Sequence, residues 1–348
     1  MVKKTIGITT TVPIEVLIAA GYTPVDLNNI FVSSPRRQRF LEVAERDGFP
    51  QNCCAWIKGI YGVCREHGIP QVLGVTTGDC SNTLMLMEVL RLRGVEAIPF
   101  AYPPEPKTTD MERALSDLAS RLGTTVAAAE EVRRELQECR RLAHVMDEST
   151  WRHHRVSGGE NHRWLVSTSD FNGDPSAYRQ DMAPLLEEVE KREPYPEDTI
   201  PLGYIGVPPI YAQELYPYLE GLGARVVYNE VQRQFAMPYP GANLAEQYTN
   251  YTYPYSVFYR LQEITAEVER RRLQGIIHYV QAFCHRGIAD IIMRHDLHVP
   301  ILTLEGNHDF LLTHHVRTRL EAFVDMLRRQ GRSSGVDGGR GKRSTKVA

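Results

Sequence analysis

Apolar and polar positions alternate along the first hundred residues in a pattern that predicts strands and helices in turn. Segments with apolar residues three and four positions apart indicate helices, several of them ending at a glycine, at 13–21, from about 36, 53–68 and 82–94. Short apolar runs indicate buried strands between them, at 5–11, 22–27, 71–77 and 95–102. This alternation is typical of a parallel α/β sheet.

The pattern changes in the middle of the chain and then returns. Residues 109–192 are charged and have helical spacing throughout, which predicts a helical insertion or bridge. Beyond it the predicted strands are 202–207, 224–230, 275–283 and 299–306. The predicted helices of this part are 210–223, a long region up to 273, 285–297 and 314–331.

The second α/β segment repeats the first, because both begin with a strand, a proline-started helix, a glycine and a second strand. Cys80 and Cys284 lie at nearly the same distance along the chain from the two glycines that end these helices, Gly21 and Gly223. We therefore predict an α/β fold of two Rossmann- or flavodoxin-like lobes with parallel sheets. The predicted division is a first lobe at 1–108, a helical insertion at 109–195, a second lobe at 196–330 and a disordered tail at 331–348.

Composition changes this picture little. The 348 residues are 42% hydrophobic and 24% charged, with a net charge of -3, so no overall positive field favours nucleic acid. No apolar run approaches the ~20 residues that cross a bilayer, and the start has no apolar segment of signal-peptide length. We expect a cytoplasmic protein that binds neither nucleic acid nor membrane. The "GRGKRST" of the tail lacks the glycine spacing and the hydroxyl of a phosphate loop.

The six cysteines include no Cys-x-x-Cys pair, so any metal site must combine distant segments. Cys80 and Cys284 follow predicted strands and precede helices, and Cys54 begins another helix. Helix N-termini lower a thiol's pKa and favour the thiolate, which ligates metal. Three such thiolates in a cleft between the lobes could hold an iron–sulfur cluster with one iron free of cysteine. Cys64 and Cys139 are expected to pack as small hydrophobic residues.

Taken together, these segments resemble the 2-hydroxyacyl-CoA dehydratase D-component family over residues 4–330. The resemblance is carried by "TVPIEVLIAAGYTPVDL", "CAWIKGIYG", "GDCSNT", "GVPPIYAQELYPYLEGLGARVV", "QAFCHRG" and "LTLEGNHDFLLTHHVRTRLEAF". It implies two related lobes that bind a cubane 4Fe-4S cluster through Cys54, Cys80 and Cys284. Cys53 is the alternative to Cys54, and the motif "CAWIKGIYG" matches the family from Cys54 onward.

Polar residues follow several predicted strands, where they could contact a substrate in the cleft. The candidate catalytic residues are Ser81, His285 and Glu305. The candidate substrate-binding residues are Thr10, Thr11, Asn82, Asn307 and His308. The alternative for the hydroxyl and amide side chains is helix capping. The family often has an acid where this chain has Asn307, which leaves the substrate class open.

The resemblance also implies electron-driven chemistry. In the dehydratases a separate ATP-hydrolysing activator delivers one electron, and a ketyl radical forms from a thioester carbonyl. The expected partners are such an activator, a second subunit, identical or related, and a small-molecule substrate. Three functions stay open: a dehydratase subunit acting on an acyl-CoA, a cluster enzyme reducing another small molecule, and a non-catalytic electron or cluster carrier. A single and a double cubane are both compatible with the sequence.

Overall fold

The computed structural model describes residues 4–336, and within them two four-stranded parallel sheets have the same strand order. The first sheet is ordered β2-β1-β3-β4 and the second β6-β5-β7-β8. The strands are β1 (Lys4–Ile8), β2 (Tyr22–Asp26), β3 (Gln71–Thr77), β4 (Glu96–Ala101), β5 (Ile200–Gly206), β6 (Ala224–Asn229), β7 (Gly275–Gln281) and β8 (Ile301–Gly306). The predicted fold class, two Rossmann-like α/β lobes, is confirmed.

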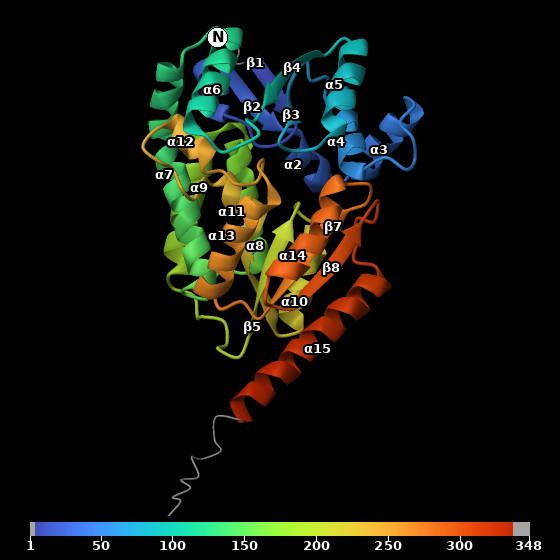
Figure 1. The fold of residues 1–348 in the computed structure, drawn as a ribbon, viewed down its shortest axis with the longest axis vertical. Coiled ribbons are helices and arrows are strands. Elements are labelled where there is room, and N and C mark those ends of the chain that lie inside the picture. Colours follow the sequence, from blue (N-terminus) through green and yellow to red (C-terminus); the bar gives the residue numbers. More distant parts are fainter. Residues whose placement is uncertain (1–3, 337–348) are drawn as a thin grey trace, which may run out of the picture.

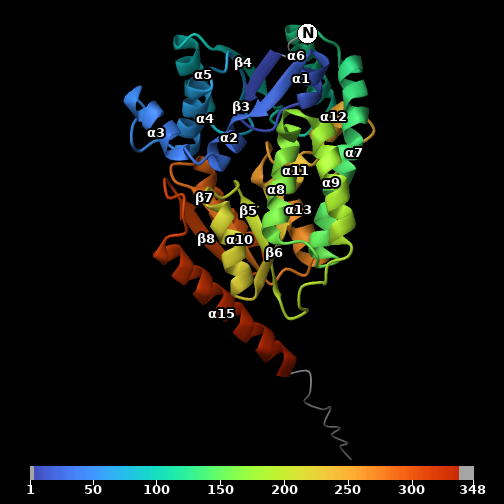
Figure 2. The ribbon, with the colours of Figure 1, turned by 180° about the vertical axis from the view of Figure 1, so that it is seen from behind.

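Helices flank both sheets, and the lobes lie one above the other in Figure 1. Those of the first lobe are α1 (Ile14–Ala19), α2 (Leu27–Ser33), α3 (Arg37–Arg46), α4 (Ala55–Glu66) and α5 (Asn82–Leu92). The helical segment, which runs along one side of the molecule in Figures 1 and 2, contains α6 (Thr108–Leu122), α7 (Val126–Trp151), α8 (Gly158–Val166), the short η1 (Ser167–Ser169) and η2 (Phe171–Gly173), and α9 (Pro175–Val189).

The second lobe contains more short helices than its sequence pattern predicts. Its helices are α10 (Ala212–Gly221), α11 (Glu230–Phe235), α12 (Leu244–Thr249), α13 (Val257–Arg270), the short η3 (His285–Ala289), α14 (Asp290–Asp296) and α15 (His314–Val336). The predicted long helical region up to 273 is thus three helices, because Pro238, Pro240 and Pro254 interrupt it and cannot donate a helical hydrogen bond. The predicted helix 285–297 begins with a 3-10 turn.

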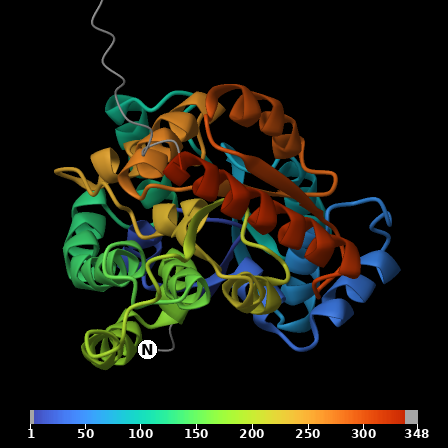
Figure 3. The same cartoon turned by 90° about the horizontal axis from the view of Figure 1, so that it is seen from below.

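The last helix, α15, packs across β5 and β8 and is seen end to end in Figure 3. It continues to Val336, so residues 331–336 of the predicted disordered tail are helical. Gly331 does not stop the helix because its φ is outside the left-handed region that glycine helix caps adopt. The remainder of the predicted tail, 337–348, lies outside the described residues.

The buried core is continuous between the two lobes. One cluster of contacting apolar side chains includes Leu27 and Phe31 of α2 together with Tyr204 of β5 and Ile277 of β7. Phe310, which follows β8, lies edge-on to Phe31 with 6.0 Å between ring centroids. The lobes are therefore held in one orientation by shared apolar packing. Among the helices of residues 4–336, none has both the length and the apolar character that crossing a bilayer requires.

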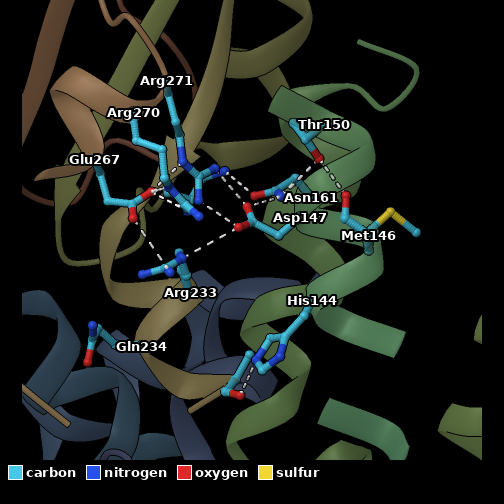
Figure 4. A network of polar contacts seen from close by, with 12 residues as sticks. His144, Met146, Asp147, Thr150, Asn161, Arg233, Gln234, Glu267, Arg270 and Arg271 are labelled. Atoms are coloured by element: carbon cyan, nitrogen blue, oxygen red, sulfur yellow. Dashed lines mark hydrogen bonds and ion pairs between the residues drawn. The ribbon is translucent and has the colours of Figure 1, made fainter. Parts of the chain in front are cut away.

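A buried ion network fixes the helical segment to the second lobe (Figure 4). Asp147 of α7 accepts hydrogen bonds from Nη1 and Nη2 of Arg271 at 2.9 and 2.6 Å. Glu267 accepts from Nε of the same arginine at 2.6 Å, and Arg233 of α11 lies 3.5 Å from Asp147. Because these groups are almost fully buried, α7, α11 and α13 are joined by charges that satisfy one another.

A second contact between the helical segment and a sheet is a pair of buried carboxyl groups. The Asp26 N–H, at the end of β2, donates to Oδ2 of Asp170 at 2.7 Å, and the Ser169 hydroxyl donates to Asp26 Oδ2 at 2.7 Å. Burial, with the neighbouring charge of Asp26, raises the pKa of Asp170 to about 7, and burial also raises the pKa of Asp26. The folded protein therefore binds a proton here that the unfolded chain has released.

We expect this proton to make stability pH-dependent. An acid whose pKa is raised on folding stabilises the native state at low pH, and that stabilisation is lost as pH rises from about 4 toward about 7. The slope for one proton is at most about 1.4 kcal/mol per pH unit. Asp170→Asn should flatten the fall of Tm between pH 5 and 8, whereas Asp181→Asn on the exposed face of α9 should not. Equal slopes in all three proteins would contradict the assignment.

Candidate metal centre

A cavity of about 110 Å³ lies where the carboxyl ends of strands from both sheets meet. Thr10 lines it from the end of β1, Cys80 from the end of β3, and Cys284 from the end of β7. Val207, which follows β5, and Cys54, which precedes α4, also line the cavity. In each sheet the central pair, β1 with β3 or β5 with β7, is the point where strand order reverses and ligands bind in open α/β folds.

Cys54 is held in place by the packing of α4. It is the N-cap of this helix, and only 5% of the residue is exposed. The nearby backbone N–H groups of Trp56 and Ile57 favour its thiolate form, although its side chain makes no capping hydrogen bond. Helix α4 lies against α3 at Gly62, where an added Cβ would be 2.2 Å from the carbonyl oxygen of Phe40. The position of the Cys54 thiol is therefore fixed by the start of α4 and by the close contact of α4 with α3 at Gly62.

Cys80 lies on a turn that requires glycine. Gly78 has a φ of +99°, and a Cβ there would be 2.9 Å from the side chains of Tyr102 and Pro254. The turn ends β3 and leads into α5, whose first N–H, that of Asn82, favours the thiolate form of Cys80. The stretch "GDCSNT" therefore aims a thiol into the cavity between a strand end and a helix start.

Cys284 follows a residue in a strained backbone conformation. Phe283 has a φ of +63°, in the left-handed region that costs a non-glycine residue about 1–2 kcal/mol. Phe283 is 55% exposed, whereas Cys284 lines the cavity. The nearby N–H groups of Arg286 and Gly287 favour the thiolate form of Cys284, although its side chain makes no capping hydrogen bond. Cys80 and Cys284 thus occupy equivalent turns of the two lobes, and each of the three thiols lies near backbone N–H groups.

The acidity of these thiols differs from the prediction. Burial raises the pKa of Cys54 to about 11 and that of Cys80 to about 12, and it also raises the pKa of Cys284. The N–H groups at the helix starts oppose this shift but do not outweigh the loss of water. The expectation of lowered pKa values was therefore wrong. Metal binding at these residues has to displace protons from the thiols.

The arrangement differs from a site for a single ion. Within residues 4–336, no three His, Cys, Asp or Glu side chains come close enough to share one metal ion. The three sulfurs are nevertheless near enough that the charges of Cys54 and Cys284 affect the pKa of Cys80. A single ion needs every ligand atom about 2.3 Å away. In a cubane each cysteine binds a different iron, so wider spacing and an all-thiol donor set fit a cluster.

The other predicted site residues are divided between the cavity and its surroundings. Thr10 and His285 line it. The predicted residues that are absent from its lining are Thr11, Ser81, Asn82, Glu305, Asn307 and His308. Ser81 precedes α5 but its hydroxyl makes no capping hydrogen bond, and the N-cap of α1 is Pro13 rather than a threonine. The capping explanation therefore fails for Ser81, Thr10 and Thr11. Cys53, unlike Cys54, does not line the cavity.

Sequence reasoning missed Arg286, which joins the two cysteine turns. Its Nη2 donates to the Gly78 carbonyl at 2.9 Å and to the Tyr253 carbonyl at 3.2 Å. Its guanidinium carbon lies 4.3 Å from the Tyr253 ring centroid. Burial raises the pKa of Asp79, also in the cavity wall, and the Arg286 charge opposes this rise. The motif "QAFCHRG" contained this residue, but nothing in one sequence shows its contact with the other lobe.

We expect Arg286→Met to loosen the site while keeping its volume. A hydrogen bond from a charged group contributes about 1.5–3 kcal/mol to stability. Losing the bonds from Arg286 to the Gly78 and Tyr253 carbonyls should therefore let the Cys80 and Cys284 turns separate more often. In metal-free protein the thiols of Cys80 and Cys284 should react with an alkylating reagent at least several-fold faster, as followed by mass spectrometry. Arg294→Met is the matched control, because Arg294 bonds only to groups of its own lobe. Unchanged labelling in Arg286→Met would show that the bridge has no such role.

Comparison with known proteins agrees with this geometry. The family model described as 2-hydroxyglutaryl-CoA dehydratase, D-component, matches residues 9–327. The matched range contains seven of the eight strands, β2 to β8, together with the helical segment and the three cavity cysteines. No curated protein matches the chain. Because the family match extends over nearly all of the described residues, the chain belongs to the 2-hydroxyglutaryl-CoA dehydratase D-component family.

Proposed function

We propose that this protein is the cluster-binding component of an enzyme of the 2-hydroxyacyl-CoA dehydratase type. The cluster is a 4Fe-4S cubane held by Cys54, Cys80 and Cys284. The observation that carries the proposal is the convergence of these three thiols, from both lobes, on one cavity at the carboxyl ends of the sheets. The family to which the chain belongs supports the reaction type.

The protein's own groups prepare the cavity for such a cofactor and its substrate. Backbone N–H groups near the three sulfurs would stabilise their anionic form. Arg286 holds the two cysteine turns together across the lobes. When bound, the cluster would supply single electrons and one iron without a cysteine ligand, able to accept a substrate oxygen. Apolar side chains such as Ile57 and Val231 limit the access of water.

Thr10 and His285 are the predicted polar residues best placed to contact a substrate. Both line the cavity, one from each lobe. Burial lowers the pKa of His285, so its imidazole is neutral near pH 7 and can accept a proton. The same neutral imidazole could bind the fourth iron. In that case the fourth iron would have no open position for a substrate, and the protein would be better described as an electron carrier.

The other predicted residues would contact parts of the substrate that extend beyond the cavity. Ser81 and Asn82 adjoin Cys80, Glu305 is the penultimate residue of the edge strand β8, and Asn307 and His308 follow this strand. A substrate longer than the cavity, such as an acyl-CoA, would extend past these positions. The proposed partners are an ATP-hydrolysing activator and a second subunit, identical or related.

The decisive experiment is anaerobic purification followed by iron and sulfide analysis. We expect a brown protein with about four irons and four sulfides per chain, as one cubane requires. About eight irons would indicate a double cubane. Zinc, or no metal after reconstitution, would overturn the proposal. Nitrogen coordination that disappears in His285→Ala would favour the electron carrier over the enzyme.

A further inference from the structure

A second and larger cavity, of about 540 Å³, lies at the opposite edge of the second lobe. Its walls come from the C-terminal ends of α7 and α13 and from residues beside the starts of β5, β6 and β7, near the lower end of α7 in Figure 1. The thiol cavity is at the carboxyl ends of the same sheet. A seven-residue strand is roughly 20 Å long, so the two cavities are separate sites.

The second cavity is strongly basic although the whole chain has a net charge of -3. One carboxylate, Glu197, is among its lining residues. The lining arginines are Arg152, Arg225, Arg270, Arg271 and Arg272. Such an excess of positive charge in a concave site attracts anions and raises their local concentration.

Two of these arginines are already paired, as Figure 4 shows. Arg271 donates hydrogen bonds to Asp147 and Glu267, and Nη2 of Arg270 donates to the same Glu267 carboxylate at 2.7 Å. Arg152 and Arg272 are exposed, and neither forms an ion pair with a carboxylate in residues 4–336. The positive charge without a paired carboxylate therefore comes mainly from Arg152, Arg272 and the buried Arg225.

Arg225 is buried without a directly paired carboxylate, and the charge of Glu220 acts on it only from a greater distance. It is 1% exposed, and its Nη1 donates to the carbonyls of Thr150 and Val156 at 2.8 and 2.6 Å. Its Nη2 bonds to Nδ1 of His154 at 2.8 Å, and the Tyr195 ring centroid lies 4.6 Å from its guanidinium carbon. No carboxylate of the described residues is within 4.0 Å of it. Burying a charge without a counter-ion in direct contact is costly, so an anion from outside would stabilise this arrangement.

Two buried donors of the same lining residues have no hydrogen-bond acceptor within residues 4–336. They are Nε of Arg225 and Nε1 of Trp151, the last residue of α7. Buried N–H groups are normally satisfied, so their presence beside an arginine-rich cavity points to a ligand with acceptor oxygens. Phosphate oxygens suit this role, because guanidinium groups bind them through paired hydrogen bonds.

We propose that this cavity binds a phosphorylated small molecule of nucleotide size, with its phosphate groups between Arg152, Arg225 and Arg272. The volume is within the range of small-molecule sites and exceeds what inorganic phosphate alone would fill. The occupant would hold the end of the helical segment against the second lobe. The proposal is independent of the cluster, because none of these residues adjoins the three cysteines.

Calorimetric titration of the full-length protein tests the proposal, with ADP, pyrophosphate and inorganic phosphate as probes. We expect saturable binding of ADP and pyrophosphate that weakens as salt rises. Arg152→Ala/Arg272→Ala should weaken it at least tenfold, and Arg225→Met should do so as well if that variant folds. ADP binding more tightly than pyrophosphate would show that the site also contacts the nucleoside, and equal binding would assign it to phosphate groups alone.

The matched control is Arg36→Ala/Arg121→Ala. Both of these arginines are exposed, are remote from the cavity and form no ion pair in the described residues. The control should bind each probe like the unaltered protein, so a general loss of positive charge is distinguished from loss of the site. Absence of saturable binding, or equal weakening in the two double variants, would overturn the proposal.

Discussion

Replacing Cys80 or Cys284 by alanine should leave the protein without a cluster. A cubane that has already one iron free of cysteine would then be held by only two thiolates, across a junction between lobes. We expect anaerobically prepared variants to contain less than a tenth of the iron and sulfide of the unaltered protein. Their circular dichroism should be unchanged, because both residues lie on turns at the edge of the core rather than within a sheet.

Cys64 and Cys139 provide the controls for this result. Both are buried, away from the cavity lining, and the Cys64 thiol donates to the carbonyl of Ile69 at 3.6 Å. Their alanine variants should keep the cluster. Cys54→Ala should lose it and Cys53→Ala should keep it, since only Cys54 lines the cavity. The reverse result for the adjacent pair would show that the family motif was aligned one residue out of place.

The sheets could be predicted because their signal is local. Each strand of the parallel sheets is a short apolar run, and the eight predicted runs all overlap the observed strands. The repeat of the two lobes was also visible in sequence, and the shared strand order confirms it. The continuous core between lobes was not visible, since the contact of Phe31 with Phe310 joins residues that no pattern relates.

The site was only partly predictable for a related reason. Position after a strand and before a helix identified Cys80 and Cys284, and a helix start identified Cys54, as residues that meet in a cleft; all three line one cavity. Their acidity depends on burial, which a helix-start argument ignores, so the direction of the pKa shift was wrong. Arg286 acts through a hydrogen bond to Gly78 in the other lobe, and such a contact requires the three-dimensional structure.

The same limit applies to the charged residues of the helical segment, where a second large effect is expected. Helical spacing indicates that α7 has a buried face, but not that Asp147 lies on it between two arginines. Removing one partner of a buried ion pair leaves the others without a counter-charge, which costs about 3–5 kcal/mol. In Asp147→Ala both Arg271 and Arg233 lose a carboxylate, and the Asn161 amide loses an acceptor.

Asp147→Ala should therefore lower the free energy of unfolding by about 3–5 kcal/mol, as measured by urea denaturation of the metal-free protein. Glu138→Ala removes a carboxylate from the same helix, where it pairs with Arg141 at the surface, and should cost no more than about 1 kcal/mol. Asp147→Asn keeps the size and the acceptor oxygen but removes the charge. A loss close to that of Asp147→Ala would assign the effect to charge, and a loss near that of Glu138→Ala would assign it to hydrogen bonding. If Asp147→Ala itself is no worse than Glu138→Ala, Arg271 is satisfied by Glu267 and the Val227 carbonyl alone, and the network does not fix the helical segment to the second lobe.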